Sequence, residues 1–255
     1  MSDTRRPLIV GNWKMHKTIA QTRAFIAQLR AHPLALALEQ VDAVVCPPFT
    51  ALAAAHEALA GSAIGLGAQN MNWAPSGPYT GEISPLMLTE IGVGWVVLGH
   101  SERRALFGEL DERVNEKVRA ALEHGITPIV AFGETAEEHS AGFAREKVES
   151  QARAAFLGLQ PDDVARCVVA YEPIWAIGSG TPDTPESANA IMGVIRAAVP
   201  GLDDVRMLYG GSLRPDNVSA FAAQPEIDGG LVGGESLEPA SFAGLIEGAR
   251  RGVEA

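Results

Sequence analysis

Three side chains able to move protons or hold negative charge each follow an apolar run of the sequence: Glu172, His100 and Lys14. A carboxylate can abstract a proton next to a carbonyl, a neutral imidazole can donate to the oxyanion that develops, and an ammonium adds fixed positive charge. Taken singly, the lysine is commonly a solvated cation, the histidine a structural group and the glutamate a buried partner for an arginine. Their shared position after apolar runs predicts proton transfer on an anionic substrate.

Two glycine-rich turns, Gly210-Gly211-Ser212 and Gly233-Gly234, follow two further apolar runs. Such turns often only reverse the chain, but they also expose backbone N–H groups, which bind phosphate at the start of a helix. If they lie on the same side of the fold as the three charged side chains, the substrate carries a phosphate group.

The stretch 170–181, AYEPIWAIGSGT, places a stiff loop directly after Glu172. Pro173 restricts the backbone, and residues 174–177 are apolar. The glycines of Gly178-Ser179-Gly180 then allow the backbone more conformational freedom. This is no dinucleotide fingerprint, because the third glycine is missing. An enediolate phosphate, the expected product of proton abstraction, loses phosphate when water reaches it. We therefore predict a lid that excludes water and brings the amide near Gly178 to the phosphate.

Short apolar runs alternate with helix-like segments about eight times along the chain. The runs are 8–10, 43–46, 63–66, 95–98, 127–130, 167–171, 205–209 and 229–232. Helix starts are predicted at Thr18, Asp111, Thr184-Pro185, Pro215 and Pro239. This pattern predicts an α/β fold, a single (β/α)8 barrel over residues 1–255, with chemistry at the strand ends. A doubly wound open sheet shares the alternation, and periodicity does not decide between the two.

The composition, with 47% hydrophobic and 20% charged residues among 255, is that of an ordinary globular chain. The formal net charge of −11 disfavours nucleic acid and anionic membranes as partners, and no apolar run approaches the ~18 residues of a membrane span. The two cysteines fit a reducing compartment, so we expect a cytoplasmic protein. The sequence has no HExxH or paired CxxC motif, and we expect neither metal nor cofactor.

Six motifs, in order, resemble the triosephosphate isomerase family over nearly the whole chain. They are GNWKMH at 11–16, GAQNM at 67–71, GHSERR at 99–104, AYEPIWAIGSG at 170–180, YGGS at 209–212 and DGGLVGG at 228–234. The resemblance implies a TIM barrel that interconverts D-glyceraldehyde 3-phosphate and dihydroxyacetone phosphate through an enediol(ate). It also places the reaction in glycolysis and gluconeogenesis, and it implies no cofactor.

By the same resemblance, Glu172 is the base that moves the proton between two carbons, and His100 is the neutral electrophile that shuttles protons on the oxygens. Lys14 holds the anionic substrate and Asn12 hydrogen-bonds beside it. The implied phosphate ligands are the backbone amides of Gly178, Ser212, Gly233 and Gly234.

His100 precedes Ser101-Glu102-Arg103, which predicts the start of a helix. The positive end of that helix would disfavour an imidazolium and leave a neutral donor. The resemblance adds that Ser101 and Glu102 support the catalytic groups from behind, with the Glu102 carboxylate near Lys14.

Members of this family are typically homodimers in which one subunit's third loop reaches the other's active site. The segment 73–82, WAPSGPYTGE, resembles that loop, and Thr80 corresponds to the residue that approaches the neighbour's Asn12 and Lys14. Without the other motifs, the segment would be an ordinary surface turn rich in proline and glycine.

Four positions depart from the family pattern. Thr181-Pro182-Asp183 replaces a lysine and small residues at the far hinge of the lid, and Pro182 predicts a stiffer hinge. Ser179 stands where threonine is usual, and Ala131 where a cysteine is usual near the base. Glu235 replaces a small residue just after the phosphate-binding glycines, and we expect its carboxylate to point away from the phosphate.

Two other functions compete with the isomerase of a three-carbon phosphate. One is an isomerase of a four-carbon sugar phosphate of the erythrulose phosphate type. The hinge and Glu235 lie at positions that could discriminate between substrates of different length. The other is a non-catalytic phosphate-binding scaffold, which would have no need for Lys14, His100 and Glu172 together. The complete EPIWAIGSG and VGG motifs favour the three-carbon substrate.

Overall fold

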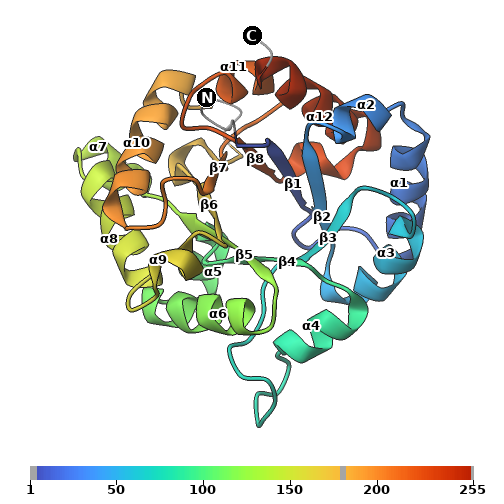
Figure 1. The fold of residues 1–255 in the computed structure, drawn as a ribbon, viewed down its shortest axis with the longest axis horizontal. Helices are drawn as coiled ribbons and strands as arrows, with labels where there is room; N and C mark the ends of the chain where they lie inside the picture. The colour runs from blue at the N-terminus through green and yellow to red at the C-terminus, as the bar shows by residue number, and fades with distance from the viewer. Residues whose placement is uncertain (1–4, 179–181, 254–255) are drawn as a thin grey trace.

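The computed structural model describes residues 5–178 and 182–253, and within these ranges parallel strands form a closed barrel surrounded by helices (Figure 1). Each strand pairs with the next along the chain, and β1 (Leu8–Asn12) also pairs with β8 (Gly229–Val232). The sheet therefore has no open edge. This closure excludes the doubly wound open sheet and confirms the predicted (β/α)8 barrel.

The strands occupy the apolar runs of the sequence. They are β1 Leu8–Asn12, β2 Asp42–Cys46, β3 Gly65–Ala68, β4 Trp95–Leu98, β5 Thr127–Phe132, β6 Val168–Tyr171, β7 Arg206–Tyr209 and β8 Gly229–Val232. β3 begins at Gly65, so the start predicted for this strand at residue 63 was too early. Its glycines allow a close approach to β2, since a Cβ added at Gly67 would lie 2.5 Å from Cys46 Sγ.

Helices follow the strands around the outside of the barrel (Figure 1). The α-helices are α1 Ile19–Ala31, α2 Ala35–Leu38, α3 Leu52–Leu59, α4 Pro85–Ile91, α5 Ser101–Phe107, α6 Asp111–Glu123, α7 Ala136–Ser140, α8 Ala144–Ala155, α9 Pro161–Val164, α10 Pro185–Ala198, α11 Val218–Ala222 and α12 Pro239–Val253. The 3₁₀ helices are η1 Phe49–Ala51, η2 Ile174–Ala176 and η3 Gly234–Leu237. No helix in the described ranges is both long and apolar enough to cross a membrane.

The helix starts predicted at Thr18, Asp111, Thr184-Pro185 and Pro239 are confirmed, and the first and third have side-chain caps. Thr18 and Gln21 form a capping box in which each side chain bonds the other's backbone N–H, and α1 begins at the next residue after Thr18. Thr184 Oγ accepts a hydrogen bond from Ser187 N, with Pro185 at the first helical position of α10. These caps set the residues at which α1 and α10 begin.

The start predicted at Pro215 was wrong, because α11 begins only at Val218. A turn occupies the preceding residues, where Asn217 Oδ1 accepts the backbone N–H of Arg214 at 2.8 Å. The Arg214 carbonyl accepts the backbone N–H groups of Asn217 and Val218, so residues 215–217 form a turn that leads into α11.

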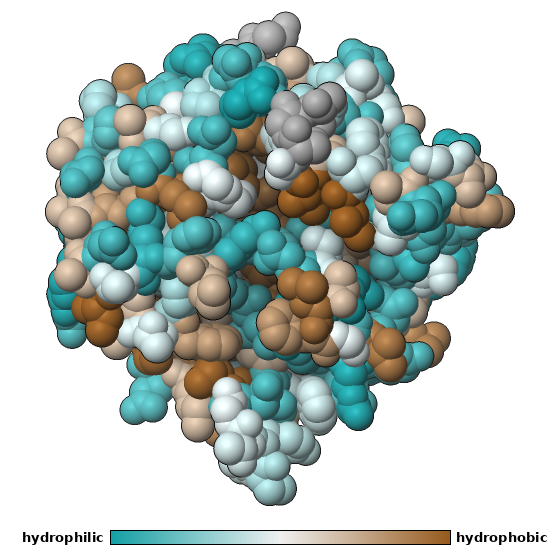
Figure 2. Space-filling view, turned by 180° about the vertical axis from the view of Figure 1, so that it is seen from behind, coloured by the Kyte–Doolittle hydropathy of each residue, from teal (hydrophilic) through white to brown (hydrophobic). Residues whose placement is uncertain are grey.

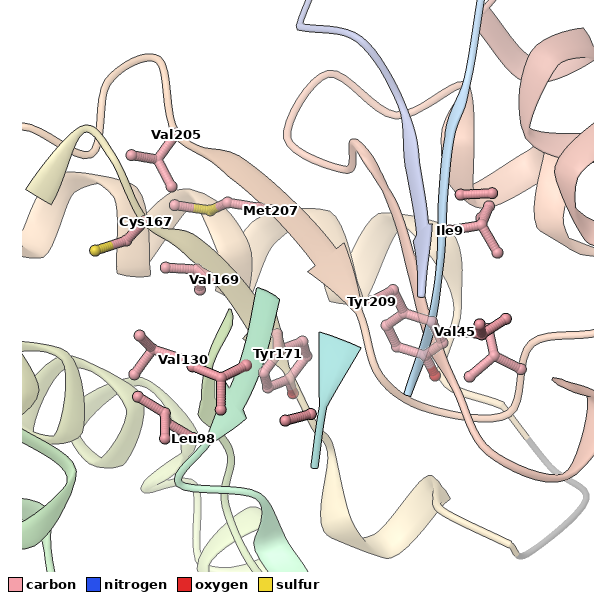
Figure 3. Close-up of a cluster of buried hydrophobic side chains, with 14 of the residues drawn as sticks. Ile9, Val45, Leu98, Val130, Cys167, Val169, Tyr171, Val205, Met207 and Tyr209 are labelled. Atoms are coloured by element: carbon pink, nitrogen blue, oxygen red, sulfur yellow. The ribbon is translucent and has the colours of Figure 1, made fainter. Parts of the chain in front are cut away.

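Apolar side chains alternate along each strand between two cores. In β6, Val169 and Tyr171 belong to the cluster between the barrel and its helices (Figure 3), whereas Val168 and Ala170 fill the barrel interior. This is the period of two that parallel strands impose. Because Tyr171 is the last residue of β6, the next residue, Glu172, emerges at the carboxyl end of the barrel.

The segment between β3 and α4 leaves the ring of helices and projects at the bottom of Figure 1. In Figure 2 it forms a lobe of mostly pale and teal residues. Its base is fixed by the edge-to-face contact of Trp73 with Tyr79, whose ring centroids are 5.5 Å apart. The projection contains 73–82, the segment predicted to reach a second subunit.

Candidate active site

A cavity of about 360 Å³ lies at the carboxyl ends of β1, β4, β6, β7 and β8. It is lined by Asn12, Lys14, His100, Glu172, Ile177, Gly178, Gly210, Gly211, Ser212, Leu213, Arg214, Leu231, Val232, Gly233, Gly234 and Glu235. The structure thus brings together the charged side chains and the glycine-rich turns predicted from the sequence. Within the described part of the chain, no group of three or more His, Cys, Asp or Glu side chains could hold a metal ion.

Glu172 is only 2% exposed, and its carboxylate is held at both oxygens. Oε2 accepts the backbone N–H of Ser101 at 2.8 Å, and Oε1 lies 3.0 Å from His100 Nε2. Glycines make room for it, since a Cβ at Gly133 would lie 1.8 Å from the Glu172 carbonyl oxygen and one at Gly210 would lie 2.8 Å from its Cγ. The carboxylate is therefore buried, oriented and next to the cavity.

His100 is the N-cap residue of α5 and is 5% exposed. Its Nδ1 accepts the backbone N–H of Glu102 at 3.2 Å, so the ring proton resides on Nε2, which faces Glu172. An imidazolium would lose this bond and would face the positive end of α5. The geometry suits a neutral donor directed into the site.

Lys14 adopts a φ of 51°, in the left-handed region that side chains other than glycine seldom occupy. Its N–H donates to Asn12 Oδ1 at 3.1 Å, its carbonyl accepts from Gln69 Nε2 at 2.8 Å, and its Nζ lies 2.7 Å from Glu102 Oε1. These contacts hold the ammonium at the cavity despite the strained backbone. Gln69 was not predicted to support the site, although it is the polar residue that follows β3.

The turns predicted to bind phosphate line the same cavity. A Cβ at Gly233 would lie 3.3 Å from Lys14 Cε, so the turn after β8 packs against the lysine. Ser212 Oγ donates to the carbonyl of Ala176 at 2.7 Å, which ties the turn after β7 to the loop after β6. Gly178 and Gly234 also line the cavity.

The loop after β6 is anchored by Glu134, a residue that the sequence analysis missed. Glu134 is fully buried, and its Oε1 accepts from Trp175 Nε1 at 2.7 Å and from Tyr171 Oη at 3.0 Å. His139 packs against Trp175 with the two rings tilted by 34° and their centroids 4.3 Å apart. Glu134 could have been identified from its position in the sequence, because it follows β5 as the other polar residues of the site follow their strands.

The four departures have different structural outcomes. Glu235 lines the cavity, and its carboxylate accepts a hydrogen bond from Ser241 Oγ in the first turn of α12; its orientation away from a bound phosphate stays a prediction. Ala131 is fully buried inside the barrel. Ser179 and Thr181 lie outside the described residues. Asp183 is buried near the start of α10.

Thr80 does not line the cavity of its own chain. It is exposed on the projecting segment 73–82 and lines a separate groove with Asn72, Trp73, Tyr79, Glu82, Arg103, Phe107, Gly108, Glu109, Arg113 and Lys117. The guanidinium of Arg113 lies over the Trp73 ring at 4.5 Å.

A sequence model of the family described as triosephosphate isomerase matches residues 7–249. The chain is 50% identical over 251 residues to a triosephosphate isomerase of Symbiobacterium thermophilum, covering 96% of this chain and 97% of that protein. It is 50% identical over 248 residues to one of Chloroflexus aurantiacus, covering 95% and 98%, and 47% identical over 248 residues to one of a Roseiflexus species, covering 95% and 97%.

Proposed function

The chain belongs to the triosephosphate isomerase family, and from that premise we propose how its residues carry out the reaction. The chain is an isomerase that interconverts D-glyceraldehyde 3-phosphate and dihydroxyacetone phosphate by intramolecular proton transfer, a step of glycolysis. The observation that supports the proposed roles best is the cavity that Glu172, His100 and Lys14 share with the turns after β7 and β8.

Glu172 acts as the base. Its carboxylate takes a proton from the carbon next to the carbonyl, while His100 Nε2–H donates to the carbonyl oxygen, which gives an enediol intermediate. The protonated Glu172 then returns the proton to the neighbouring carbon, and the imidazole recovers its proton from the other oxygen. Glu172 Oε1 lies 3.0 Å from His100 Nε2, so both groups can reach the same bound substrate once the Nε2 proton turns to the substrate's oxygen.

Lys14 and Asn12 stabilise the negative charge of the substrate and of the enediolate. The ammonium is paired with Glu102 at 2.7 Å, so it is held in place but keeps donors for the substrate. Fixed positive charge in a site that excludes water costs no reorganisation as the reaction proceeds.

The phosphate lies against the backbone amides of Gly178, Ser212, Gly233 and Gly234. The segment 173–178 serves as a lid that keeps water from the enediolate, with Trp175 bonded to Glu134 at its near end and Ala176 bonded to Ser212 over the site. These two partly buried bonds set where the lid closes.

The alternative four-carbon substrate is not favoured, because the family and the relatives carry the name of the three-carbon isomerase. A coupled assay tests the choice by comparing kcat/KM for D-glyceraldehyde 3-phosphate and for erythrulose phosphate. The proposal expects the three-carbon substrate to be preferred by orders of magnitude. Equal values, or preference for the four-carbon sugar, would overturn it.

A homodimer and a cytoplasmic location are further parts of the proposal. The projecting segment 73–82, with Thr80 exposed, supports a dimer in which this segment reaches the partner's cavity. Sedimentation should give twice the chain mass, and deletion of 74–81 should give monomers with little activity. The buried free thiols Cys46 and Cys167 fit a reducing compartment, and we propose that residues 1–255 fold as one catalytic domain there.

A further inference from the structure

Lys17 lies in the loop after β1, shortly beyond Lys14, and the proposed mechanism does not use it. Its φ of 72° is in the left-handed region, as is the φ of 51° at Lys14. Residues other than glycine are strained there, so the loop keeps this shape only where other contacts stabilise it. The contacts of Lys17 therefore bear on the position of Lys14.

The ammonium of Lys17 is held by a carbonyl and by two aromatic rings. Its Nζ donates to the Leu237 carbonyl at 2.7 Å and lies 4.8 Å from the ring centroid of Phe25 and 5.6 Å from that of Trp13. Both rings are buried and pack edge to face with centroids 4.7 Å apart, so they offer the cation a fixed aromatic surface. Burial lowers the pKa of Lys17, opposed by the charge of Glu238. Lys17 thus joins the loop after β1 to the segment that contains Leu237.

Leu237 ends η3, the short 3₁₀ helix that continues the glycine-rich turn after β8. Gly233 directly precedes η3 and Gly234 is its first residue, and both line the cavity. The Gly233 carbonyl accepts the backbone N–H of Ser236 at 2.9 Å and its hydroxyl at 2.6 Å, which closes the turn on itself. A hydrogen bond at the Leu237 carbonyl therefore restrains the position of the two glycines.

The loop after β1 and the turn after β8 also meet at the cavity. A Cβ at Gly233 would lie 3.3 Å from Lys14 Cε. The distance from the Lys14 ammonium to the amides of this turn is therefore set by how the two segments pack. A substrate that contacts both needs that distance to be held.

We propose that Lys17 is a positioning residue for the isomerisation: its ammonium fixes the loop after β1 against η3, and so sets the distance between Lys14 and the amides of the turn after β8. The inference rests on the proposed function, since it assumes that these groups bind one phosphorylated substrate. A lysine that only covered the two aromatic rings would contribute to stability and would affect all substrates alike.

The test compares Lys17→Met and Lys17→Arg with the wild type on D-glyceraldehyde 3-phosphate and on D-glyceraldehyde, which has no phosphate. Lys147→Met is the matched control, because Lys147 is a partly exposed lysine that pairs with Glu138 outside the cavity. For Lys17→Met we expect kcat/KM to fall about tenfold with the phosphorylated substrate, mostly through KM, and to stay within about twofold with glyceraldehyde. Arginine keeps a cation and donors over the rings, so it should restore most of the loss.

Lys17→Gly separates the side chain from the backbone. Glycine adopts a φ of 72° without strain, so this variant favours the shape of the loop but lacks the ammonium. We expect it to lose at least as much kcat/KM on the phosphorylated substrate as Lys17→Met does.

The outcomes are distinguishable. Near wild-type kcat/KM in Lys17→Gly, equal losses of Lys17→Met on both substrates, or failure of arginine to restore activity would overturn this inference alone. A Lys17→Met protein that sedimented at a lower mass than the wild type would place the effect in assembly and would overturn it as well. Absence of wild-type turnover of D-glyceraldehyde 3-phosphate would overturn the proposed function and this inference with it.

Discussion

Glu172 Oε1 and His100 Nε2 lie 3.0 Å apart, so the side chains that we propose as base and proton donor hydrogen-bond to each other. The imidazole is held in one tautomer by the backbone N–H of Glu102, which donates to Nδ1. The Nε2 proton is therefore available first to Glu172 and, once substrate binds, to the substrate's oxygen. The two side chains therefore lie at the same part of the cavity.

His100→Gln should lower kcat by about a hundredfold to ten-thousandfold, because the donor that protonates the oxygens is lost. The coupled assay with D-glyceraldehyde 3-phosphate measures this. KM should change little, since the phosphate contacts remain. A variant with near wild-type kcat would mean that another group protonates the oxygens.

Lys14→Met should raise KM for the phosphorylated substrate by roughly tenfold or more, because the cavity loses the ammonium group that Glu102 holds in place. Glu102 would also be left without its partner at 2.7 Å. Lys147→Met is the matched control, since Lys147 pairs with Glu138 outside the cavity. If both variants changed KM equally, the effect would come from overall charge rather than from Lys14.

Glu235→Ala should leave KM within about twofold of the wild-type value. The carboxylate lines the cavity but is bonded to Ser241, so its removal takes little negative charge from the phosphate position. Initial-rate measurements at several ionic strengths check this. A large drop in KM would show that the carboxylate faces the phosphate.

Asp183→Asn should raise the midpoint of thermal unfolding by a few degrees at neutral pH. Burial raises the pKa of Asp183 above its ordinary value of 3.8, so the ionised form costs stability at any pH above the raised value. As pH falls through the raised value towards 3.8, the wild type is relieved of this cost and the difference between the two proteins shrinks. Thermal melts from neutral to acidic pH measure it, and a difference that grew on acidification would contradict the sign.

The positions of the functional side chains could be predicted because they follow strands of a barrel. Glu172, His100 and the glycine-rich turns all emerge at the carboxyl ends of parallel strands, so local pattern was enough to place them on one side. The contacts that support them could not be predicted. Gln69 bonds the Lys14 carbonyl, and Glu134 bonds Trp175, across separations that no local pattern reports.

The limits of local pattern also explain the errors in the fold. Gly65 and Gly67 weaken the sequence signal of β3, although close packing against β2 requires a glycine at the second position. Pro215 resembled a helix start, but the side chain of Asn217 stabilised a turn in its place. In both cases a contact formed only in the folded state decided the outcome.

The central claim is that Glu172 carries the proton between the two carbons. The most direct measurement is the turnover of D-glyceraldehyde 3-phosphate by the wild type and by Glu172→Gln, which keeps the shape and the bond to the Ser101 amide but removes the base. We predict rapid wild-type turnover and a loss of about a thousandfold or more in kcat, with KM within about threefold. A folded Glu172→Gln variant that turned over at near the wild-type rate would contradict the account.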